Sequence, residues 1–407
     1  MTYADIILPL PLEGYFTYCV PDTLAPRLQP GCRVRVPLGK TKTYTGLVAA
    51  LHDQVPAGLK TGKEGVKSIV EMMDPGPVLL PQQLRLWQWI ADYYLSPIGD
   101  VYKAALPSGL KAEDDYRPKT ETYVVLADDF RSAQALRAAQ AMLQRAPAQQ
   151  KVLRVYLELA SVSEENPVPQ REITREELMN ESHCTTTVLR QFLDRRILRQ
   201  YEKEVGRIPL GGMPHPEHIK PLSEAQADAY NQILVQQMSK DITLLHGVTS
   251  SGKTEIYIHL IQRALDEGRQ VLYLLPEIAL TVQMMQRLRR VFGDRLGIYH
   301  SRYSDAERVE IWKRQLSDHP YDVILGARSA LFLPFQRLGL VIVDEEHEQS
   351  FKQMDPAPRY HARSAAIILA KLCGAKVLLG TATPSSESYW NAQTGKYGYV
   401  RLDKRYQ

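Results

Sequence analysis

The chain has 407 residues, a hydrophobic content of 44%, a charged content of 24% and a formal net charge of +4. This length exceeds what one compact core usually holds and predicts roughly two to four domains, whereas the small net charge excludes a strongly acidic or basic protein. The four cysteines form no C-x-x-C pair, which excludes a zinc site of that kind, and no apolar run approaches the roughly 18 residues of a membrane span. The sequence therefore predicts a reducing, cytoplasmic location without a membrane partner.

Residues 1–112 predict a small β-barrel-like domain with a helical appendage. Short strand-like runs are separated here by Pro and Gly, and a helical pattern covers Pro81 to Tyr94. One alternating run places Arg33 and Arg35 on the same face of a strand. Basic residues outnumber acidic residues across 33–67, which suits either a solvated face or a phosphate-binding surface.

Residues 119–206 predict a second domain, after a linker-like stretch at 113–118. Helices are expected at 174–180 and 184–194 with a short turn between them, and 197–205 has the pattern of a β-wing. Two helices followed by a wing are typical of a winged helix-turn-helix. The domain is therefore expected either to contact DNA or to serve as a packing or protein-contact module.

Residues 207–221 are rich in Pro and Gly and predict a linker, whereas residues 222–407 alternate strands with helices. The expected strands lie near 242–246, 270–275, 295–299, 321–326, 338–343 and 375–380. This order predicts a parallel sheet with helices on both faces.

Residues 247–254 form a complete G-x-x-x-x-G-K-T phosphate loop between an expected strand and an expected helix. Its backbone N–H groups suit a phosphate anion, Lys253 is expected to reach the β- and γ-phosphates, and the Thr254 hydroxyl is expected to ligate Mg²⁺. A glycine turn that merely resembles the motif is the alternative. The expected nucleotide-binding residues of the loop are Gly247, Val248, Thr249, Ser250, Ser251, Gly252, Lys253 and Thr254.

The sequence Asp-Glu-Glu-His at 344–347 leaves an apolar strand at its carboxyl end, where ligands collect in open α/β sheets. Asp344 is expected to hold Mg²⁺ through its waters, and Glu345 to orient or activate the attacking water. Lys253, Asp344 and Glu345 are therefore the predicted catalytic residues. A solvated acidic turn is the alternative. Gln226, before the first strand of this domain, is expected to bind an adenine edge.

Further residues at the same sheet edge suit a nucleic acid. Arg328, Thr381 and Thr383 follow strands and offer a guanidinium and hydroxyls to a phosphate backbone. The loop after the acidic motif carries the aromatic and cationic side chains of Phe351, Lys352, Arg359, Tyr360 and His361. Such a loop suits stacking on single-stranded bases, with packing as a lid as the alternative.

Together these motifs resemble superfamily 2 helicases, and closely the primosomal replication-restart helicases, over the whole chain. The segments that look specific to this family are 31–37, 97–101, 247–254, 275–281, 326–332, 344–347 and 359–363. The resemblance implies a 3′-DNA-binding domain, a winged helix and RecA-like lobes. It also implies ATP- and Mg²⁺-dependent 3′→5′ unwinding at stalled or branched forks, binding of 3′-ended and single-stranded DNA, and primosome assembly. The implied partners are primosome proteins and single-stranded DNA-binding protein, in a bacterial, nucleoid-associated setting.

The resemblance also implies a pocket for a DNA 3′ end in the first domain. Phe16 and Lys67 fall on matching positions, whereas Thr17 replaces an acidic residue. The DNA-binding residues expected in this domain are Phe16, Thr17, Tyr18, Arg33, Arg35 and Lys67.

The chain stops at Gln407, before the zinc cysteines, second lobe and arginine finger that the resemblance implies. An arginine finger stabilises the charge of a phosphoryl-transfer transition state. We therefore expect a truncated form that binds DNA, binds nucleotide weakly and hydrolyses little ATP, with Zn²⁺ only in the absent part. The alternatives are a double-strand DNA translocase or remodelling ATPase, and a non-catalytic DNA-structure adaptor.

Overall fold

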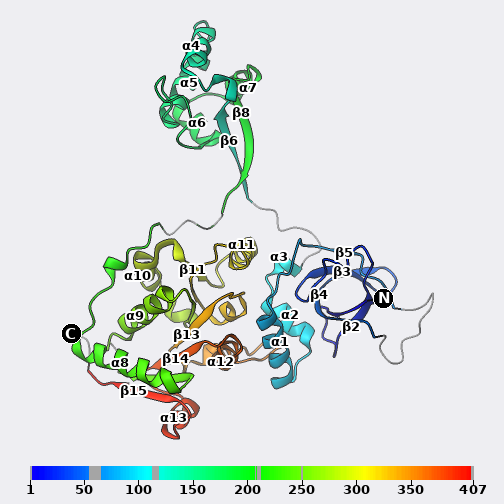
Figure 1. Ribbon diagram of the computed structural model, residues 1–407, viewed down its shortest axis with the longest axis vertical. Helices are drawn as coiled ribbons and strands as arrows, with labels where there is room; N and C mark the ends of the chain where they lie inside the picture. Colours follow the sequence, from blue (N-terminus) through cyan, green and yellow to red (C-terminus); the bar gives the residue numbers. More distant parts are fainter. Residues whose placement is uncertain are drawn as a thin grey trace. The chain divides into compact units, whose positions relative to one another are not determined.

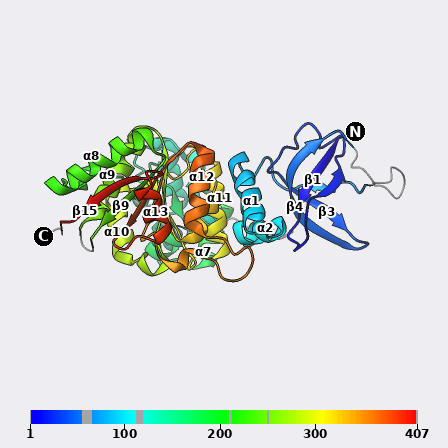
Figure 2. The same ribbon diagram turned by 90° about the horizontal axis from the view of Figure 1, so that it is seen from below.

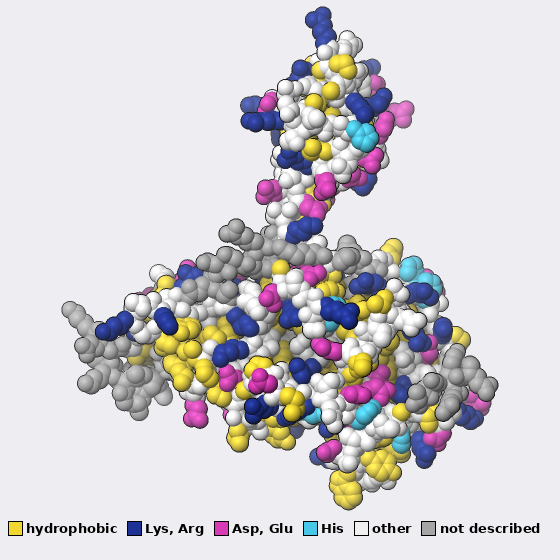
Figure 3. Space-filling view, turned by 180° about the vertical axis from the view of Figure 1, so that it is seen from behind, with side chains coloured by type: hydrophobic (Ala, Val, Ile, Leu, Met, Phe, Trp, Pro, Cys, Tyr) yellow, Lys and Arg dark blue, Asp and Glu magenta, His cyan; other side chains and the backbone are white. Residues whose placement is uncertain are grey.

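The computed structural model describes residues 2–54, 66–111, 119–206, 208, 212–248 and 251–404. The chain forms two compact units, one made of Met1–Tyr116 with Pro209–Gln407 and the other made of Arg117–Ile208. Across the face shown in Figure 3, Lys and Arg side chains are interspersed with Asp and Glu rather than gathered in one field. No helix among the described residues is long and apolar enough to cross a membrane.

The larger unit begins with a five-stranded antiparallel sheet in the order β2-β1-β4-β3-β5 (Figure 2). Its strands are β1 (Tyr3–Ile7), β2 (Phe16–Cys19), β3 (Arg33–Leu38), β4 (Lys42–His52) and β5 (Glu71–Met72). The two edges meet, because the Cys19 N–H donates to the Lys67 carbonyl at 2.8 Å and the Ile69 N–H donates to the Cys19 carbonyl at 3.0 Å. The sheet therefore curls into the small barrel that the sequence predicts.

Three helices follow the barrel, namely α1 (Pro81–Tyr93), α2 (Ile98–Ala105) and α3 (Ser108–Lys111). They lie between the barrel and the second part of the same unit (Figure 2). The Gln83 amide donates to the Phe332 carbonyl at 2.6 Å, and the Trp312 indole donates to the Val78 carbonyl at 2.8 Å. Because these side chains are buried, the helices hold the barrel against the second part.

The second part contains a seven-stranded parallel sheet in the order β11-β12-β10-β13-β14-β9-β15 (Figure 1). Its strands are β9 (Ile242–Gly247), β10 (Gln270–Leu274), β11 (Leu296–Tyr299), β12 (Val323–Gly326), β13 (Leu338–Asp344), β14 (Lys376–Thr381) and β15 (Gly398–Leu402). The sequence did not predict β15, an edge strand whose alternation covers only five residues. All neighbours run parallel, so the carboxyl ends of the strands meet at one edge.

Helices cover both faces of this sheet, as predicted (Figure 2). They are α8 (Glu224–Ser239), α9 (Lys253–Asp266), α10 (Val282–Phe292), α11 (Asp305–Leu316), α12 (Ala362–Cys373) and α13 (Ser386–Gln393). The apolar faces of α8, α9 and α10 share one core with alternate strand residues such as Val271, Tyr273 and Leu275. Successive strand side chains point to opposite faces, so α11 and α12 pack on the other side. The sheet and its layers confirm the predicted RecA-like architecture.

The smaller unit has the predicted winged-helix architecture, with a three-stranded sheet in the order β7-β6-β8. Its elements are β6 (Thr120–Leu126), α4 (Ala133–Met142), α5 (Pro147–Leu159), β7 (Ile173–Thr174), α6 (Arg175–Ser182), α7 (Thr186–Asp194) and β8 (Leu198–Glu204). His183 ends α6 in a left-handed conformation, and the Thr185 hydroxyl caps α7 by accepting from the Val188 N–H. Tyr156 and Phe192 lie fully buried at the centre of this unit.

Candidate functional site

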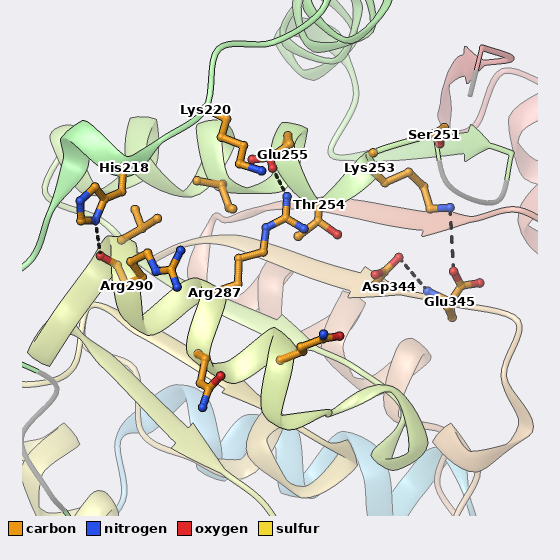
Figure 4. A pocket seen from close by; sticks show the side chains of 15 residues that line it. His218, Lys220, Ser251, Lys253, Thr254, Glu255, Arg287, Arg290, Asp344 and Glu345 are labelled. Carbon is orange, nitrogen blue, oxygen red and sulfur yellow. Dashed lines mark hydrogen bonds and ion pairs between the residues drawn. The ribbon is translucent and has the colours of Figure 1, made fainter. Parts of the chain in front are cut away.

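A cavity of about 700 Å³ opens at the carboxyl edge of the parallel sheet (Figure 4). One end of it is lined by Ser251, Gly252, Lys253, Thr254, Asp344 and Glu345. These residues come from the loop after β9 and from the end of β13, which the sheet places on either side of β14. Thr249 and Ser250 of the predicted loop lie outside the described residues.

Lys253 begins α9, after Gly252 adopts a left-handed φ of +78° that favours glycine. Its amine donates to the Gly247 carbonyl at 3.1 Å and lies 3.9 Å from the Glu345 carboxylate. Lys253 is only 9% exposed, and the N-terminus of a long helix stands beside it. A buried ammonium at a helix N-terminus suits a phosphate group.

Asp344 ends β13 as a buried carboxylate between two tyrosines. Its Oδ1 accepts from the Tyr257 hydroxyl at 2.9 Å, and its Oδ2 accepts from the Tyr273 hydroxyl at 3.4 Å. Burial raises the pKa of Asp344 to about 6, and the Glu345 charge acts in the same direction, while the Tyr257 bond and Lys253 oppose it. A desolvated carboxylate that lines the same cavity as the Thr254 hydroxyl fits a magnesium ion bound through water.

Glu345 lines the cavity with an unusual backbone conformation. Its φ of +49° lies in the left-handed region, which costs a residue with a side chain about 1–3 kcal/mol and is found most often at functional sites. The conformation turns the chain directly after β13, so Glu345 faces Lys253 while the Asp344 side chain lies beside it (Figure 4).

Glu346, which the sequence did not single out, is fully buried and anchors the acidic motif. Its carboxylate accepts from Arg363 at 2.6 Å, from the Ser385 N–H at 2.7 Å and from the Ser388 hydroxyl at 2.9 Å. Burial favours the neutral acid, but the Ser385 N–H and the Arg363 charge together hold the pKa of Glu346 below its usual range. Its position within the acidic motif was the sequence feature that could have identified Glu346 as a functional residue, although the sequence does not show its hydrogen-bond partners.

His347 connects the acidic motif to the turn after β14. Its Nδ1 lies 2.7 Å from the Thr381 hydroxyl, and its Nε2 lies 3.3 Å from the Thr383 hydroxyl. Thr381 is fully buried, so a direct contact with DNA is closed to it in this conformation, whereas Thr383 is exposed. The pair forms a continuous polar path from the cavity to the surface.

Gln226 lies beneath the phosphate loop rather than in the cavity. Its amide carbonyl accepts from the Ser223 N–H at 2.8 Å as part of the α8 capping box, and its amide nitrogen donates to the Gly252 carbonyl at 3.2 Å. The side chain is 1% exposed and is not among the described residues that line the cavity. The expected contact with an adenine edge would require these bonds to break.

The aromatic and cationic loop is packed on the lobe in the described conformation. The Phe351 and Tyr360 rings are each 1% exposed, and Arg328 donates to the Lys352 carbonyl at 3.2 Å. Burial lowers the pKa of His361 to about 4, with the charges of Arg363 and Lys352 acting in the same direction, so its imidazole is neutral at pH 7. Stacking of the Phe351 and Tyr360 rings on bases would therefore require them to leave this packing.

The outer side of the same loop keeps its cations at the surface. Arg359 is exposed, and the Lys352 amine lies 5.0 Å from the centre of the Tyr94 ring. The Tyr94 hydroxyl accepts from the His361 N–H at 3.1 Å, so α1 contacts the loop directly. The structure thus brings the loop beside the helices that follow the barrel.

Barrel closure places Lys67 beside β2, which carries three of the predicted DNA-binding residues. The Lys67 amine donates to the Gly39 carbonyl, and the Phe16 ring packs half-buried on the barrel core. The Thr17 hydroxyl donates to the Asp5 carboxylate at 2.8 Å, across the β1–β2 ladder. A carboxylate from β1 therefore accompanies Thr17. The Tyr18 ring, in contrast, is buried.

The two arginines of β3 are held by acidic partners. Arg33 is 8% exposed, makes two hydrogen bonds to Asp74 at 2.6 and 2.8 Å, and donates to the Leu110 carbonyl at 2.7 Å. Arg35 lies 3.1 Å from Glu71. Arg33 therefore cannot reach DNA in this conformation, because the α3 segment covers it. Strand alternation predicts that Arg33 and Arg35 share a face, but it cannot predict this covering segment.

The fold and the cavity define a helicase-type nucleotide-binding lobe, and a family model described as DEAD/DEAH box helicase matches residues 223–390. Two further models match, a PriA 3′DNA-binding domain over residues 5–107 and a winged helix domain of PriA helicase over residues 121–205. The chain belongs to the PriA family of replication restart proteins.

Curated relatives named replication restart protein PriA match over the full chain. The Haemophilus influenzae protein is 34% identical, with 100% of this chain and 52% of the relative covered, and the Bacillus subtilis protein is 31% identical, with 100% and 56% covered. The chain thus spans about half the length of these relatives. Among solved structures, the helicase MrfA bound to DNA matches 49% of this chain and 30% of its own, with 18% identity and a TM-score of 0.32, which is too low to support a functional argument.

Proposed function

We propose that this protein acts as an ATP-dependent 3′→5′ DNA helicase that recognises stalled or branched replication forks and starts primosome assembly. The observation that carries this proposal is the convergence of Lys253, Asp344 and Glu345 on one cavity, in a chain whose first domain matches a 3′DNA-binding model. Primosome proteins and single-stranded DNA-binding protein are the proposed partners, in a nucleoid-associated setting.

The cavity residues divide the work of phosphoryl transfer in this proposal. Lys253 offsets the charge of the β- and γ-phosphates, and Thr254 and Asp344 hold Mg²⁺, which supplies further charge neutralisation when bound. Glu345 lies 3.9 Å from the lysine amine, so it is placed to orient a water near the terminal phosphate. Gly247, Val248, Ser251 and Gly252 shape the loop around the phosphates.

The polar path from the cavity supplies a means to couple the nucleotide to DNA. His347 contacts Thr381 and Thr383 and lies 3.6 Å from the Glu345 carboxylate. A movement of the Glu345 side chain on nucleotide binding would therefore alter the hydrogen bonds of both threonines. We assign the DNA contact of this region to Thr383 and to the exposed Arg359 of the 351–361 loop.

The described lining of the cavity comes entirely from this lobe and the segment that precedes it. In superfamily 2 helicases, as the resemblance implies, a second lobe supplies charge to the transition state. We therefore propose that the described cavity residues bind the nucleotide and that fast hydrolysis also needs a charge supplied from outside this lobe. A DNA-stimulated turnover of many ATP molecules per second by this polypeptide would contradict that statement.

In this proposal, the barrel residues near Thr17 bind the DNA 3′ end. A 3′-hydroxyl needs a hydrogen-bond acceptor, and Asp5 brings a carboxylate next to Thr17, where the resemblance implies an acidic residue. We assign the terminal phosphate to Lys67 on the closing edge, whose amine donates to the Gly39 carbonyl in the described conformation. Phe16 supplies an aromatic ring beside them.

Fluorescence anisotropy on forks with and without a leading-strand 3′ end tests this proposal. The parent is expected to prefer the 3′-ended fork, Lys67→Ala to lose roughly five- to tenfold of that affinity, and Asp5→Asn to lose its preference for a 3′-hydroxyl over a 3′-phosphate. Lys103→Ala, which removes a surface lysine of α2, is the matched control.

The same titrations separate the alternatives. Equal binding of forks with and without a 3′ end would favour the double-strand DNA translocase over the helicase proposed here. Fork-dependent function that survives Lys253→Ala intact would favour the non-catalytic adaptor, because the phosphate-binding ammonium would then be dispensable.

A further inference from the structure

Residues 212–222, here called the entry segment, overlap the predicted linker but are fixed on the parallel-sheet lobe. The His215 N–H donates to the Val291 carbonyl at 2.8 Å, and the Asp294 N–H donates to the Gly212 carbonyl at 2.8 Å. Both bonds involve the C-terminal end of α10 or the turn after it. The segment is therefore attached where α10 ends.

The second half of the entry segment is attached to α9. The His259 imidazole lies 2.9 Å from the Lys220 carbonyl, and Ile219 and Leu222 pack against the core that α8, α9 and α10 share. Attachment at both ends makes the entry segment a wall of the lobe rather than a free connection.

This wall forms the end of the nucleotide cavity that lies opposite the phosphate loop (Figure 4). The lining residues labelled there in Figure 4 are His218 and Arg290, and the Lys220 side chain extends toward Glu255. The His218 Nδ1 lies 3.3 Å from the Arg290 carbonyl, so the imidazole ring lies next to the backbone that carries the Arg290 side chain. The outer end thus combines an imidazole, an ammonium and a guanidinium.

An ion pair stands between the outer end and the phosphate loop. Arg287 pairs with Glu255, which is 4% exposed on the first turn of α9 beside Thr254 (Figure 4). The pair places a neutral boundary between Lys253 and the outer cations. The cavity therefore has a phosphate end and a separate cationic end, and its volume lies within the range of cofactor sites.

We propose that His218, Lys220 and Arg290 bind the base and ribose of a purine nucleotide whose phosphates lie at Lys253. This inference rests on the proposed function of the cavity as an ATP site. Guanidinium and imidazole planes stack on aromatic rings, and the N–H donors of Arg and Lys match the acceptor atoms of a base and the ribose oxygens. The amide of Gln226 is engaged beneath the loop, so the entry segment takes over contact with the base.

Two probes separate the base end from the phosphate end in the full 407-residue chain. Fluorescent ADP is titrated directly, and inorganic tripolyphosphate, which lacks a base and ribose, competes with it. Arg290→Ala is expected to weaken ADP binding roughly five- to tenfold and to leave tripolyphosphate binding unchanged. Arg290→Lys keeps the charge but loses the planar group, so it is expected to weaken ADP binding as well.

Two variants complete the comparison. Lys253→Ala is expected to weaken both probes, because it removes the phosphate contact. Arg263→Ala removes an exposed arginine on the outer side of α9, where it pairs with Glu267, and is expected to change neither probe. Arg290 is exposed, so its variants are expected to fold as the parent does.

Three results would overturn the inference. Unchanged ADP affinity in both Arg290 variants would show that the base binds elsewhere, while the proposed ATP site would stand. Equal weakening of ADP and tripolyphosphate would assign Arg290 to the phosphates. Binding of neither probe by the parent would overturn the proposed ATP site and the base site together.

Discussion

At the residue scale, Glu346 shows how one buried charge positions the residues around a nucleotide cavity. The side chain is 0% exposed, and its donors come from α12, from the N-terminal cap of α13 and from α13 itself. Asp344 and Glu345 precede it directly, so any rotation of this strand end would break the Arg363 pair. Glu346 therefore acts on the cavity by holding its neighbours in place.

Removing this carboxylate is expected to destabilise the lobe. Glu346→Ala leaves the Arg363 side chain, which is 13% exposed, without its charge partner, and this costs about 3–5 kcal/mol in the free energy of unfolding. Glu346→Gln keeps the shape and part of the hydrogen bonding and is expected to cost less. Urea unfolding followed by tryptophan fluorescence measures both, with Glu267→Ala, from an exposed helical pair, as the control. Identical midpoints for Glu346→Ala and the parent would contradict this assignment.

The residues that line the phosphate end of the cavity could be predicted from the sequence, because each belongs to a short motif whose position in the fold is known. Lys253 belongs to a loop motif between a strand and a helix, and Asp344 ends an apolar strand, so a parallel sheet brings them to one edge. The positions of Phe351 and Tyr360 were not predictable in the same way. Their burial depends on segments distant in sequence, such as Phe332, whose ring lies 5.2 Å from the Tyr360 ring.

At the element scale, the entry segment differs most from its predicted form. Its Pro and Gly content predicts local chain direction and the absence of regular structure, and the structure agrees apart from a short 3₁₀ turn at Pro216–His218. Composition does not specify tertiary hydrogen bonds. The segment therefore appeared in the sequence as a linker, although Gly212 and His215 attach it to the end of α10.

The attachment of the entry segment brings the Gly212 backbone close to Gly293, and a substitution at Gly293 tests whether the attachment requires this close approach. It has a φ of +53°, and a Cβ placed there would lie 2.4 Å from the Gly212 carbonyl oxygen. Gly374 ends α12 at a φ of +67° with no atom within 4 Å of such a Cβ. Gly374→Ala carries the left-handed backbone cost of about 1–2 kcal/mol. Gly293→Ala carries its own backbone strain, at a φ of +53° and a ψ of −129°, and in addition displaces the entry segment.

Hydrogen–deuterium exchange measures that displacement. The amides of His215 and Asp294 are expected to exchange at least tenfold faster in Gly293→Ala than in Gly374→Ala, because their partners lie on the two sides of the clash. Equal protection of these amides in the two variants would show that the segment yields to the extra methyl group without losing its attachment.

At the scale of the whole molecule, the barrel and the parallel-sheet lobe share one compact unit, and α1 forms the joint. The buried Gln83 amide makes two hydrogen bonds in this joint. Its carbonyl accepts from the Leu80 N–H at 2.7 Å, its nitrogen donates to the Phe332 carbonyl at 2.6 Å, and the side chain is 1% exposed. A domain proposed to bind a DNA 3′ end is thereby attached to the lobe proposed to bind ATP.

Replacing this amide is expected to uncouple the two parts. Gln83→Leu leaves the Leu80 N–H and the Phe332 carbonyl buried without partners, at about 1–3 kcal/mol each. A ligand stabilises every part of a protein that unfolds in the same transition as its binding site. In the parent, ADP is therefore expected to raise the melting temperature of the barrel and of the lobe by the same amount. In Gln83→Leu, calorimetry is expected to resolve a barrel transition that ADP no longer shifts. The control is Gln82→Leu, the same change one position earlier on α1, which is expected to behave as the parent. If ADP still raised the melting temperature of the barrel in Gln83→Leu, the apolar contacts of α1 would suffice for the coupling.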